Sequence, residues 1–375
     1  MLVLFTPIWI SLGNALTNPS LGFSLPARLA EWSRNHGANG LISWVENLYY
    51  SHHAPPVGGH PAAGVVPTTT TGGATTSARQ GGLPMPAALK PFSATPSWPG
   101  EGQWSPAGRL VNGVPAIYTT TLSPDAIHTS VVDGIAWMDT KLLTATLYSG
   151  SFIPGPPPSG PFYKHTAPIQ PSAASSLVAA FNAGFRLQDA MGGYFTDGRT
   201  IIPLRQGAAS FVIFKNGTAT VGAWGRDVTM SPNVVSVRQN LNLLVENGKP
   251  APGLATNQGS QWGAVLGNSI FVERSGIGVT KDGALVYVGG PNLDAVGLAN
   301  LLVRAGAVRA MELDINADWV NYATFKPAGG STLASQANAT DLLPASGMSS
   351  MQNRYFASWW ARDFITMSAR PNTGG

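Results

Sequence analysis

Charged side chains are too scarce in this chain to cover the solvent-facing sides of long helices. Asp, Glu, Lys and Arg make up 11% of the 375 residues, far below the ~25% of an average soluble domain. The chain also contains 44 Gly and 30 Pro, residue types that interrupt helices and form turns. Since 44% of the residues are hydrophobic, a substantial core is available, and the composition favours turn-rich β structure around it.

Charge and cysteine content exclude several classes of function. The formal net charge of +4 reflects a shortage of acidic residues, because the basic residues are scattered along the chain. We therefore expect no nucleic-acid partner. The absence of cysteine excludes disulfides, zinc–thiolate sites and thiol nucleophiles. A domain with a core of this size can be stable outside the cell without disulfides.

Residues 1–24 form an apolar segment, and no charged residue precedes Arg28. The most apolar part, Met1 to Leu12, is shorter than the ~20 residues that span a bilayer, and it lacks the basic start of a signal peptide. One interpretation is a weak export signal or a buried apolar segment. The other, which we favour, is the outer part of a transmembrane helix whose inner part lies upstream. Either one predicts an extracytoplasmic protein, membrane-anchored or secreted.

Two further segments are predicted before the main domain. Residues 25–53 are expected to form a short, membrane-proximal helical hairpin, with Pro26 in a first helical turn and Gly37 at the end of that helix. Apolar residues from Leu41 to Leu48 recur at helical spacing. Residues 54–100 are rich in Pro, Thr and Gly, so we expect a disordered linker there.

Residues 105–370 are predicted to form a single β-rich domain of the α+β class. Asn-Gly and Asp-Gly pairs at 216–217, 247–248 and 282–283 separate β-branched runs, which is typical of hairpins. A helix is predicted from Leu293 to Ala305 with Gly306 after its end. A buried strand from Val308 to Ile315 follows, and a strand after a helix among hairpins indicates α+β. The clearest other strands are expected at 114–121, 142–148, 210–214 and 284–288.

Carboxylates are rare enough in this domain for their positions to be informative. Glu312, Asp314 and Asn316 alternate along the last predicted strand and would point to one of its faces. Buried carboxylates are costly unless they are paired or bind a ligand. This face therefore indicates a polar site at the end of the strand, and a salt-bridged edge strand is the alternative.

Two other clusters combine polar groups with glycine. Glu273 and Arg274 are followed by Ser-Gly-Ile-Gly, where a guanidinium group could receive an oxyanion next to bare backbone. An ordinary β-bulge is the alternative. Asn182 and Gly184 lie between two phenylalanines, in a segment that could equally be a tight turn.

Together, and in this order, the three clusters resemble the phosphodiester glycosidase family. Residues 182–185 match the family's Asn-Gly-Gly-Phe-like turn, with Ala183 in place of the first glycine. Residues 274–283 match its Arg-Ser/Thr segment and the Asp-Gly hairpin that follows. Residues 313–318 match the end of its Leu-Asp-Gly-Gly-Gly-Ser strand, but here the glycines are replaced by Ile, Asn and Ala. The resemblance covers residues 171–322.

The resemblance implies hydrolysis of the bond between a sugar's anomeric carbon and a phosphodiester oxygen. It implies that Asp314 acts as base or nucleophile and that Arg274 holds the phosphate, with Arg205 as a second candidate for that role. Glu312 is a further candidate for the catalytic carboxylate and is specific to this sequence. The expected substrate-binding residues are Asn182, Gly184, Arg205, Glu273, Asn316 and Trp319, of which Asn182 would orient sugar hydroxyls and Trp319 would stack on a sugar ring.

The predicted function is that of an extracytoplasmic hydrolase cleaving a sugar-1-phosphodiester bond in a cell-envelope or polysaccharide substrate. Its partners would be a carbohydrate or phosphoglycan and, through the N-terminus, a membrane. A divalent metal held by Asp314 and its neighbours is left open as a cofactor. The alternatives are a non-catalytic module that binds envelope glycan and a structural envelope protein. We favour the enzyme because Arg274, Glu312 and Asp314 exceed what a lectin-like site requires.

Overall fold

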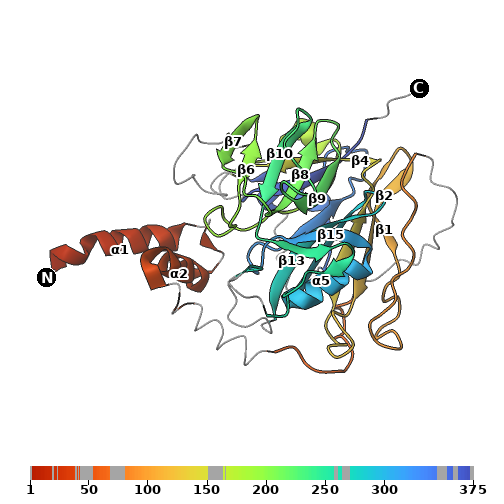
Figure 1. The fold of residues 1–375 in the computed structure, drawn as a ribbon, viewed down its shortest axis with the longest axis horizontal. Helices are drawn as coiled ribbons and strands as arrows, with labels where there is room; N and C mark the ends of the chain where they lie inside the picture. Colours follow the sequence, from red (N-terminus) through yellow and green to blue (C-terminus); the bar gives the residue numbers. More distant parts are fainter. Residues whose placement is uncertain are drawn as a thin grey trace.

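Three antiparallel sheets form the main body of the protein, seen here in a computed structural model (Figure 1). The structure describes residues 2–18, 21–22, 24–38, 40, 42, 54–67, 81–150, 164, 166–256, 261–263, 271–343, 353–357 and 362–371. Within these residues strands far outnumber helices, so the β-rich domain expected from the sequence is confirmed.

The largest sheet has eight strands in the order β1-β2-β3-β14-β13-β15-β11-β12. Their bounds are Ser105–Val111 (β1), Val114–Leu122 (β2), Asp133–Met138 (β3), Leu285–Leu293 (β14), Val272–Thr280 (β13), Ala307–Glu312 (β15), Leu243–Glu246 (β11) and Lys249–Pro250 (β12). Helix α5 (Ala295–Arg304) packs on one face of this sheet against β13, β14 and β15.

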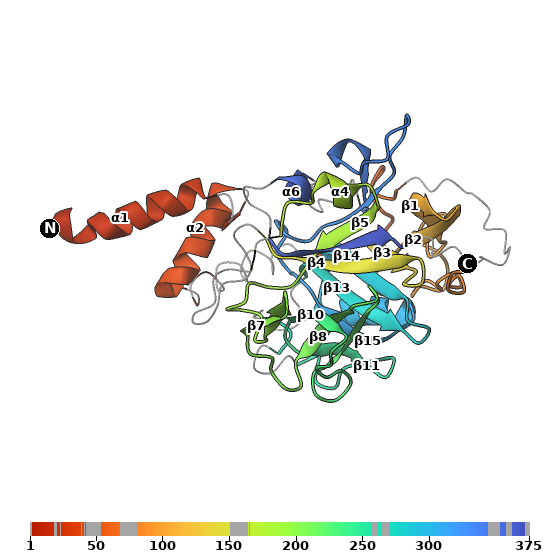
Figure 2. The same cartoon turned by 90° about the horizontal axis from the view of Figure 1, so that it is seen from above.

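Two five-stranded sheets complete the body. One has the order β7-β6-β10-β8-β9, and the other β17-β16-β5-β18-β4. The strands of the first are Arg199–Ile202 (β7), Tyr194–Thr196 (β6), Val234–Gln239 (β10), Ala209–Phe214 (β8) and Ala219–Ala223 (β9). Those of the second are Ala339–Asp341 (β17), Tyr322–Phe325 (β16), Leu177–Asn182 (β5), Phe364–Ala369 (β18) and Leu143–Tyr148 (β4). The short helices α4 (Pro171–Ala174) and α6 (Asn353–Phe356) lie beside the second sheet (Figure 2).

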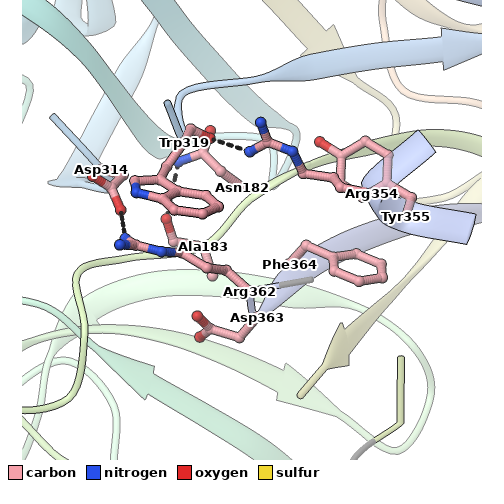
Figure 3. A pocket seen from close by; sticks show the side chains of 9 residues that line it. All are labelled: Asn182, Ala183, Asp314, Trp319, Arg354, Tyr355, Arg362, Asp363 and Phe364. Carbon is pink, nitrogen blue, oxygen red and sulfur yellow. Dashed lines mark hydrogen bonds and ion pairs between the residues drawn. The ribbon is translucent and has the colours of Figure 1, made fainter. Parts of the chain in front are cut away.

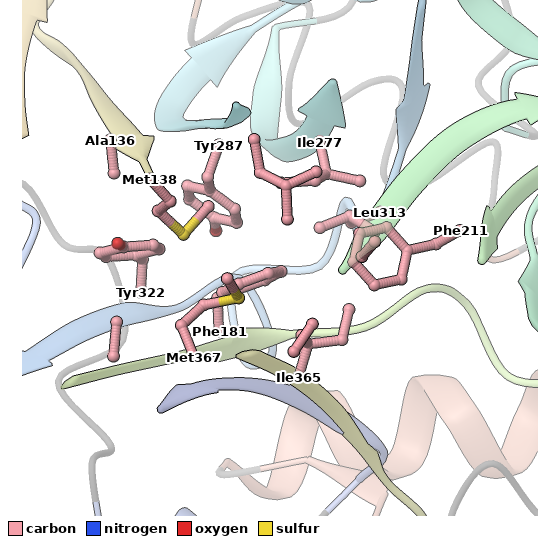
Figure 4. Close-up of a cluster of buried hydrophobic side chains, with 14 of the residues drawn as sticks. Ala136, Met138, Phe181, Phe211, Ile277, Tyr287, Leu313, Tyr322, Ile365 and Met367 are labelled. Atoms are coloured by element: carbon pink, nitrogen blue, oxygen red, sulfur yellow. The ribbon is translucent and has the colours of Figure 1, made fainter. Parts of the chain in front are cut away.

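The main core lies where the three sheets meet (Figure 4). Ile277 and Tyr287 come from the eight-stranded sheet, Phe211 from β8, and Phe181 and Ile365 from β5 and β18. These side chains are at most 1% exposed. A second cluster joins the opposite face of the large sheet to the apolar side of α5. The large sheet is therefore covered on both faces, and a polar side chain on either face is removed from water.

Local sequence signals account for the turns and the helix. Gly217 and Gly283 have φ of +77° and +88° in the β8–β9 and β13–β14 hairpins, conformations that glycine adopts without strain. The expected hairpins are confirmed, including the third, between β11 and β12. Helix α5 begins after Asp294, whose Oδ1 accepts a hydrogen bond from the amide of Gly297 at 2.6 Å, and ends before Gly306, which has φ of +92°.

Strand β15 is shorter than predicted, because it ends at Glu312 rather than Ile315. The Asp314 Oδ1 atom accepts hydrogen bonds from the backbone amides of Ile315 and Asn316 at 2.9 and 3.0 Å. Such a turn offers the backbone an alternative to the strand ladder. The expectation that Glu312, Asp314 and Asn316 share one strand face is therefore wrong, since only Glu312 belongs to the strand.

Part of the predicted linker is packed rather than disordered. Leu83, Leu89 and Trp98 are at most 8% exposed, and the amide of Leu83 donates to Asp139 Oδ2 at 2.8 Å. The few large apolar side chains of this segment bury themselves against the large sheet, which offsets part of the ordering entropy. The prediction of disorder is wrong for residues 81–100.

The N-terminal segment forms a pair of packed helices, α1 (Leu2–Thr17) and α2 (Leu25–Ser33), at one side of the body (Figure 2). Ser24 caps α2 by accepting from the amide of Ala27 at 3.2 Å, and Pro26 lies in its first turn as expected. In the described part of the chain, no helix has both the length and the apolar character needed to cross a membrane. The helix predicted from Leu41 to Leu48 falls, apart from Ile42, outside the described residues.

Candidate active site

Asn182 is held rigidly at the end of β5 by buried hydrogen bonds. Its Nδ2 donates to the Ser275 Oγ at 2.9 Å, and its Oδ1 accepts from the Tyr287 hydroxyl at 2.9 Å. The backbone amide of Asn321 donates to the same Oδ1 at 3.1 Å. Asn182 therefore joins β5 to β13 and β14, and its side chain positions the neighbouring groups of the site.

Ser275 connects this network to Asp314. The Ser275 Oγ donates to the backbone oxygen of Asp314 at 3.0 Å and accepts from the Asp314 amide at 3.2 Å. The Ser275 amide also donates to the Asp314 oxygen at 2.9 Å. Ser275 was not among the predicted site residues, although it lies in the motif that singled out Arg274. Its bonds fix the backbone that carries the Asp314 carboxylate.

The Asp314 carboxylate forms an ion pair with Arg362, whose Nη1 lies 2.9 Å from Oδ2 (Figure 3). The carboxylate is buried, with Asp314 only 4% exposed. Burial raises the pKa of Asp314, while the charge of Arg362 and the two backbone amides on Oδ1 act in the opposite direction. Asp314 is thus a desolvated carboxylate whose ionised form depends on Arg362.

Two arginines enclose the indole ring of Trp319. The guanidinium carbon of Arg362 lies 3.8 Å from a Trp319 ring centroid, and that of Arg354 lies 5.3 Å away. Arg354 also donates to the backbone oxygens of Trp319 and Asp318, at 3.2 and 2.8 Å. Burial lowers the pKa of Arg354 to about 10. Trp319 is 1% exposed, so in this conformation guanidinium groups occupy the position where a sugar ring was expected to stack.

These side chains border a cavity of about 10 Å³, which is the room of about one water molecule. The cavity is lined from the end of β5, from the loop after β15, from α6 and from the start of β18 with the residues before it (Figure 3). Its lining residues are Asn182, Ala183, Asp314, Trp319, Arg354, Tyr355, Arg362, Asp363 and Phe364. Asp314, Asn182 and Trp319 of the predicted set are therefore brought together, and the site is nearly closed.

The N-terminal segment contacts the edge of this site. Glu31 of α2 is 5% exposed and pairs with Arg186 at 2.6 Å and with Arg34 at 2.8 Å. Burial lowers the pKa of Arg362, and the charge of Glu31 opposes this shift. Burial raises the pKa of Asp314, and the charge of Glu31 adds to that rise. Gly22 approaches Asp318 so closely that a Cβ atom there would lie 2.8 Å from a carboxylate oxygen. The segment from Gly22 to Glu31 thus covers one side of the site.

Glu312 and Arg274 form a buried ion pair with each other. Glu312 lies opposite Gly276 in the β13–β15 register, and a Cβ atom on Gly276 would contact leucines of α5. The pair therefore lies on the α5 side of the sheet, whereas Ser275 points to the opposite side, toward Asn182. Burial raises the pKa of Glu312 to about 7, although Arg274 acts in the opposite direction. The predicted catalytic residues are thus divided between two faces.

Glu273 lies on the Ser275 side of β13 and is 8% exposed. Its Oε1 accepts no hydrogen bond from the described residues. Burial raises its pKa to about 9, with the charge of Asp318 adding to the shift and that of Arg354 opposing it. The side chain is therefore a neutral carboxylic acid at pH 7, close enough to Arg354 and Asp318 to interact with both.

The remaining predicted substrate-binding residues, Gly184, Asn316 and Arg205, do not line the Asp314 cavity. A Cβ atom on Gly184 would lie 2.9 Å from the Asn240 Cγ, so this glycine permits a close crossing of two chain segments. The Asn316 Oδ1 accepts from the amide of Asp318 at 2.8 Å and stabilises the turn after Asp314. Arg205 lines a different groove.

In the part of the chain that the structure describes, no group of three or more His, Asp or Glu residues could hold a metal ion.

Arg354 and Arg362 were missed by the sequence reasoning. Both follow the region of family resemblance, and no motif or spacing marks them. The one available signal is their charge, because arginines are unusual beside aromatic and apolar residues such as those at 355–356 and 364–365.

Comparisons with known proteins point to one family. Residues 175–314 match the phosphodiester glycosidase family, which confirms the family expected from the sequence over that range. Among solved structures, the zebrafish N-acetylglucosamine-1-phosphodiester alpha-N-acetylglucosaminidase catalytic domain, auto-inhibited by its pro-peptide, is 16% identical, with a TM-score of 0.42 over 72% of this chain and 88% of that chain. A hypothetical protein from Synechocystis is 13% identical, with a TM-score of 0.34 over 71% and 64% of the two chains. No curated protein sequence matches significantly.

Proposed function

Residues 175–314 belong to the phosphodiester glycosidase family, and on this premise we propose that the protein hydrolyses a sugar-1-phosphodiester bond in a cell-envelope or polysaccharide substrate. The observation that carries the proposal is the buried Asp314 carboxylate, 2.9 Å from Arg362 in a cavity that Arg354 also lines. A carboxylate paired with one guanidinium group, with a second guanidinium lining the same cavity, matches the two demands of this reaction. These demands are an anionic group at the anomeric carbon and cations at the phosphate.

In the proposed reaction, the bond between the anomeric carbon and the phosphate oxygen breaks. The electron pair of that bond leaves with the phosphate, which remains on the other part of the substrate as a phosphomonoester. A water oxygen becomes bonded to the anomeric carbon. Asp314 either removes a proton from this water, or first bonds to the anomeric carbon as nucleophile. In the second case, water then breaks the bond between Asp314 and the carbon and gives up a proton to solvent, which regenerates the carboxylate. In both cases Asp314 must be ionised, which the ion pair with Arg362 favours.

We assign the phosphate to Arg362 and Arg354 rather than to Arg274. The Arg274 guanidinium is paired with Glu312 and also donates from Nε to the Leu293 oxygen at 2.9 Å, so its donors are directed to protein groups on the α5 side. In contrast, Arg362 contributes an Nη1 bond to Asp314 and borders the cavity. A guanidinium group can donate two parallel hydrogen bonds to phosphate oxygens. A bound phosphate would compete with Trp319 for the two guanidinium groups.

Access to the site requires a conformational change. A cavity of about 10 Å³ is far smaller than the several hundred Å³ that hold a ligand of this size. The close approach of Gly22 to Asp318 and the electrostatic effect of Glu31 on Asp314 and Arg362 support the N-terminal segment as the part that moves. We further propose that the protein acts outside the cytoplasm, which the apolar N-terminus supports.

Sugar release from a panel of sugar-1-phosphodiesters, with and without divalent metal ions, tests the proposal. The full chain is compared with Asp314→Asn and with Asp282→Asn, a matched control on the exposed β13–β14 turn. We expect release by the wild type and the control but not by Asp314→Asn. Full activity of Asp314→Asn would contradict the role of this carboxylate. Binding of envelope glycan without release from any substrate would favour the non-catalytic binding module instead.

A further inference from the structure

A second, open groove lies away from the Asp314 cavity and is lined largely by polar groups. Its volume is about 380 Å³, within the range of sites that bind small ligands. It is formed by the loop between β7 and β8, by residues at and before β11, and by the segment 261–262. The side chains that give it chemical character are Arg205, Asn242, Glu246, Gln261 and Trp262.

Arg205 is held in this groove by buried groups. The Gln239 side chain is fully buried, and its Oε1 accepts from the Arg205 amide at 2.8 Å while its Nε2 donates to the Arg205 oxygen at 3.1 Å. The Arg205 Nη2 donates to the Asn242 Oδ1 at 3.2 Å, and the Asn242 Nδ2 donates to the Gln261 Oε1 at 3.3 Å. The three side chains therefore form a positioned row of hydrogen-bonding groups.

The charges in the groove favour an anion. Glu246 is paired with Arg226 at 3.2 Å, and Arg226 also pairs with Asp227 at 2.9 Å. Since the charge of Arg309 acts on Asp227 as well, two arginines balance these two carboxylates. Arg205 forms no ion pair with any of the described residues, and its guanidinium donates a hydrogen bond to the neutral Asn242. The indole of Trp262 is fixed by a hydrogen bond from Nε1 to the Leu243 oxygen at 2.9 Å. A fixed cation beside amides and an indole is suited to a phosphate-bearing carbohydrate.

The groove adjoins the candidate active site. A Cβ atom on Gly263, the residue after Trp262, would lie 3.3 Å from Ile315 Cδ1 and 3.6 Å from Phe185 Cζ. Ile315 follows Asp314 in the chain, and Phe185 follows Gly184, which lies close to the Asn240 side chain. The chain next to the groove therefore packs against the chain next to Asp314, so a substrate that reaches both sites would pass over Ile315 and Phe185.

We propose that this groove is a second subsite, which binds a distal phosphate of a repeating sugar-phosphate polymer while Asp314 acts on the proximal bond. Arg205 contacts the distal phosphate, and Asn242 and Gln261 contact hydroxyl groups of the adjoining sugar. The inference rests on the proposed function, since it extends the substrate from one glycosyl phosphate to a polyanionic chain. It also gives a phosphate-binding role to Arg205, the second candidate from the sequence, which lies outside the Asp314 cavity.

The test compares a monomeric sugar-1-phosphodiester with an oligomer of the same repeating unit. For Arg205→Gln we expect the KM for the oligomer to rise about tenfold, the size of one lost charge-assisted hydrogen bond. The kcat for the oligomer should be unchanged. Hydrolysis of the monomer by the same variant is the reference against which the change in KM is judged. Arg199→Gln, on an exposed position of β7, is the matched control. It should leave the KM and kcat for both substrates unchanged. An unchanged KM for the oligomer in Arg205→Gln would overturn the inference and leave the proposed function intact.

A binding measurement keeps the inference testable if no hydrolysis is found. The oligomer and an uncharged oligosaccharide of equal length are titrated into the full chain carrying Asp314→Asn, with and without Arg205→Gln. We expect the oligomer to bind about tenfold more weakly when Arg205 is replaced, and to be displaced by salt, since Arg205 is exposed. Equal affinity of the two ligands, or no effect of Arg205→Gln, would overturn the assignment of a phosphate to this groove.

Discussion

Asp314 and Arg362 form a 2.9 Å ion pair although 48 positions separate them in the sequence. The pair joins the loop after β15 to the segment that leads into β18, and Trp319 lies against the same guanidinium group at 3.8 Å. Because both partners are buried, solvent and salt screen the interaction little. The orientation of the candidate catalytic carboxylate thus depends on an element outside the region of family resemblance.

Replacing Arg362 by lysine should test this dependence. Lysine retains the positive charge but lacks the planar fork that can hold Asp314 and a phosphate together. We expect Arg362→Lys to lower kcat/KM by about 10²-fold, the size of one lost donor to developing charge, while the protein remains folded. Steady-state kinetics with circular dichroism as a folding control measures this effect. Activity within threefold of the wild type would show that the guanidinium fork is not required.

The buried Glu312–Arg274 pair should be a stability determinant. Truncation by Glu312→Ala leaves Arg274 charged and unpaired below α5, so we expect the free energy of unfolding to fall by about 3–5 kcal/mol. Urea unfolding gives the value. The double variant Arg274→Met/Glu312→Leu should recover much of the loss, since neither partner is then left unpaired. If Glu312 were instead the catalytic carboxylate, folded Glu312→Ala at low temperature would lose activity by more than 10²-fold.

Local signals made much of the fold predictable. The Asn216–Gly217 and Asp282–Gly283 turns each need positive φ, which few residues other than glycine and asparagine supply. The end of α5 at Gly306 follows from the same conformational freedom. In each of these cases, neighbouring residues in the sequence contain the whole physical cause, and the expected hairpins and helix are found.

The candidate site was predictable only in part. Asn182 and Asp314 were identified from family motifs, but the partner of Asp314 is distant in sequence and has no local pattern. The strand alternation that assigned Glu312 and Asp314 to one face failed, because Asp314 bonds its own following amides. Packing of Trp98 was also missed, since an isolated apolar residue in a Pro-rich segment does not show which surface it covers.

Glu273 should make stability depend on pH. Its pKa is about 9 in the folded protein and about 4.3 when unfolded. Between these values the unfolded state loses a proton that the folded state keeps, so the free energy of unfolding falls as pH rises from about 4.3 to about 9. Glu273→Gln mimics the protonated form and should flatten this part of the profile. Thermal unfolding between pH 5 and 9.5 measures it, and parallel profiles for the two proteins would contradict the raised pKa.

Weakening the contact between α2 and the body should increase access to the site. Glu31→Ala removes the 2.6 Å pair with Arg186, which links α2 to the segment after Gly184. Both side chains of the pair are largely buried, but Arg186 keeps its pair with Asp189. We therefore expect a loss of about 1 kcal/mol and a rise of about fivefold in kcat/KM for a sugar-1-phosphodiester. Hydrogen exchange should show faster opening of α2 in the variant. Arg34→Ala, which removes the Glu31–Arg34 pair within the N-terminal segment and leaves the Glu31–Arg186 pair in place, is the matched control. If α2 opens faster in Glu31→Ala while kcat/KM stays unchanged, the N-terminal segment does not limit substrate entry.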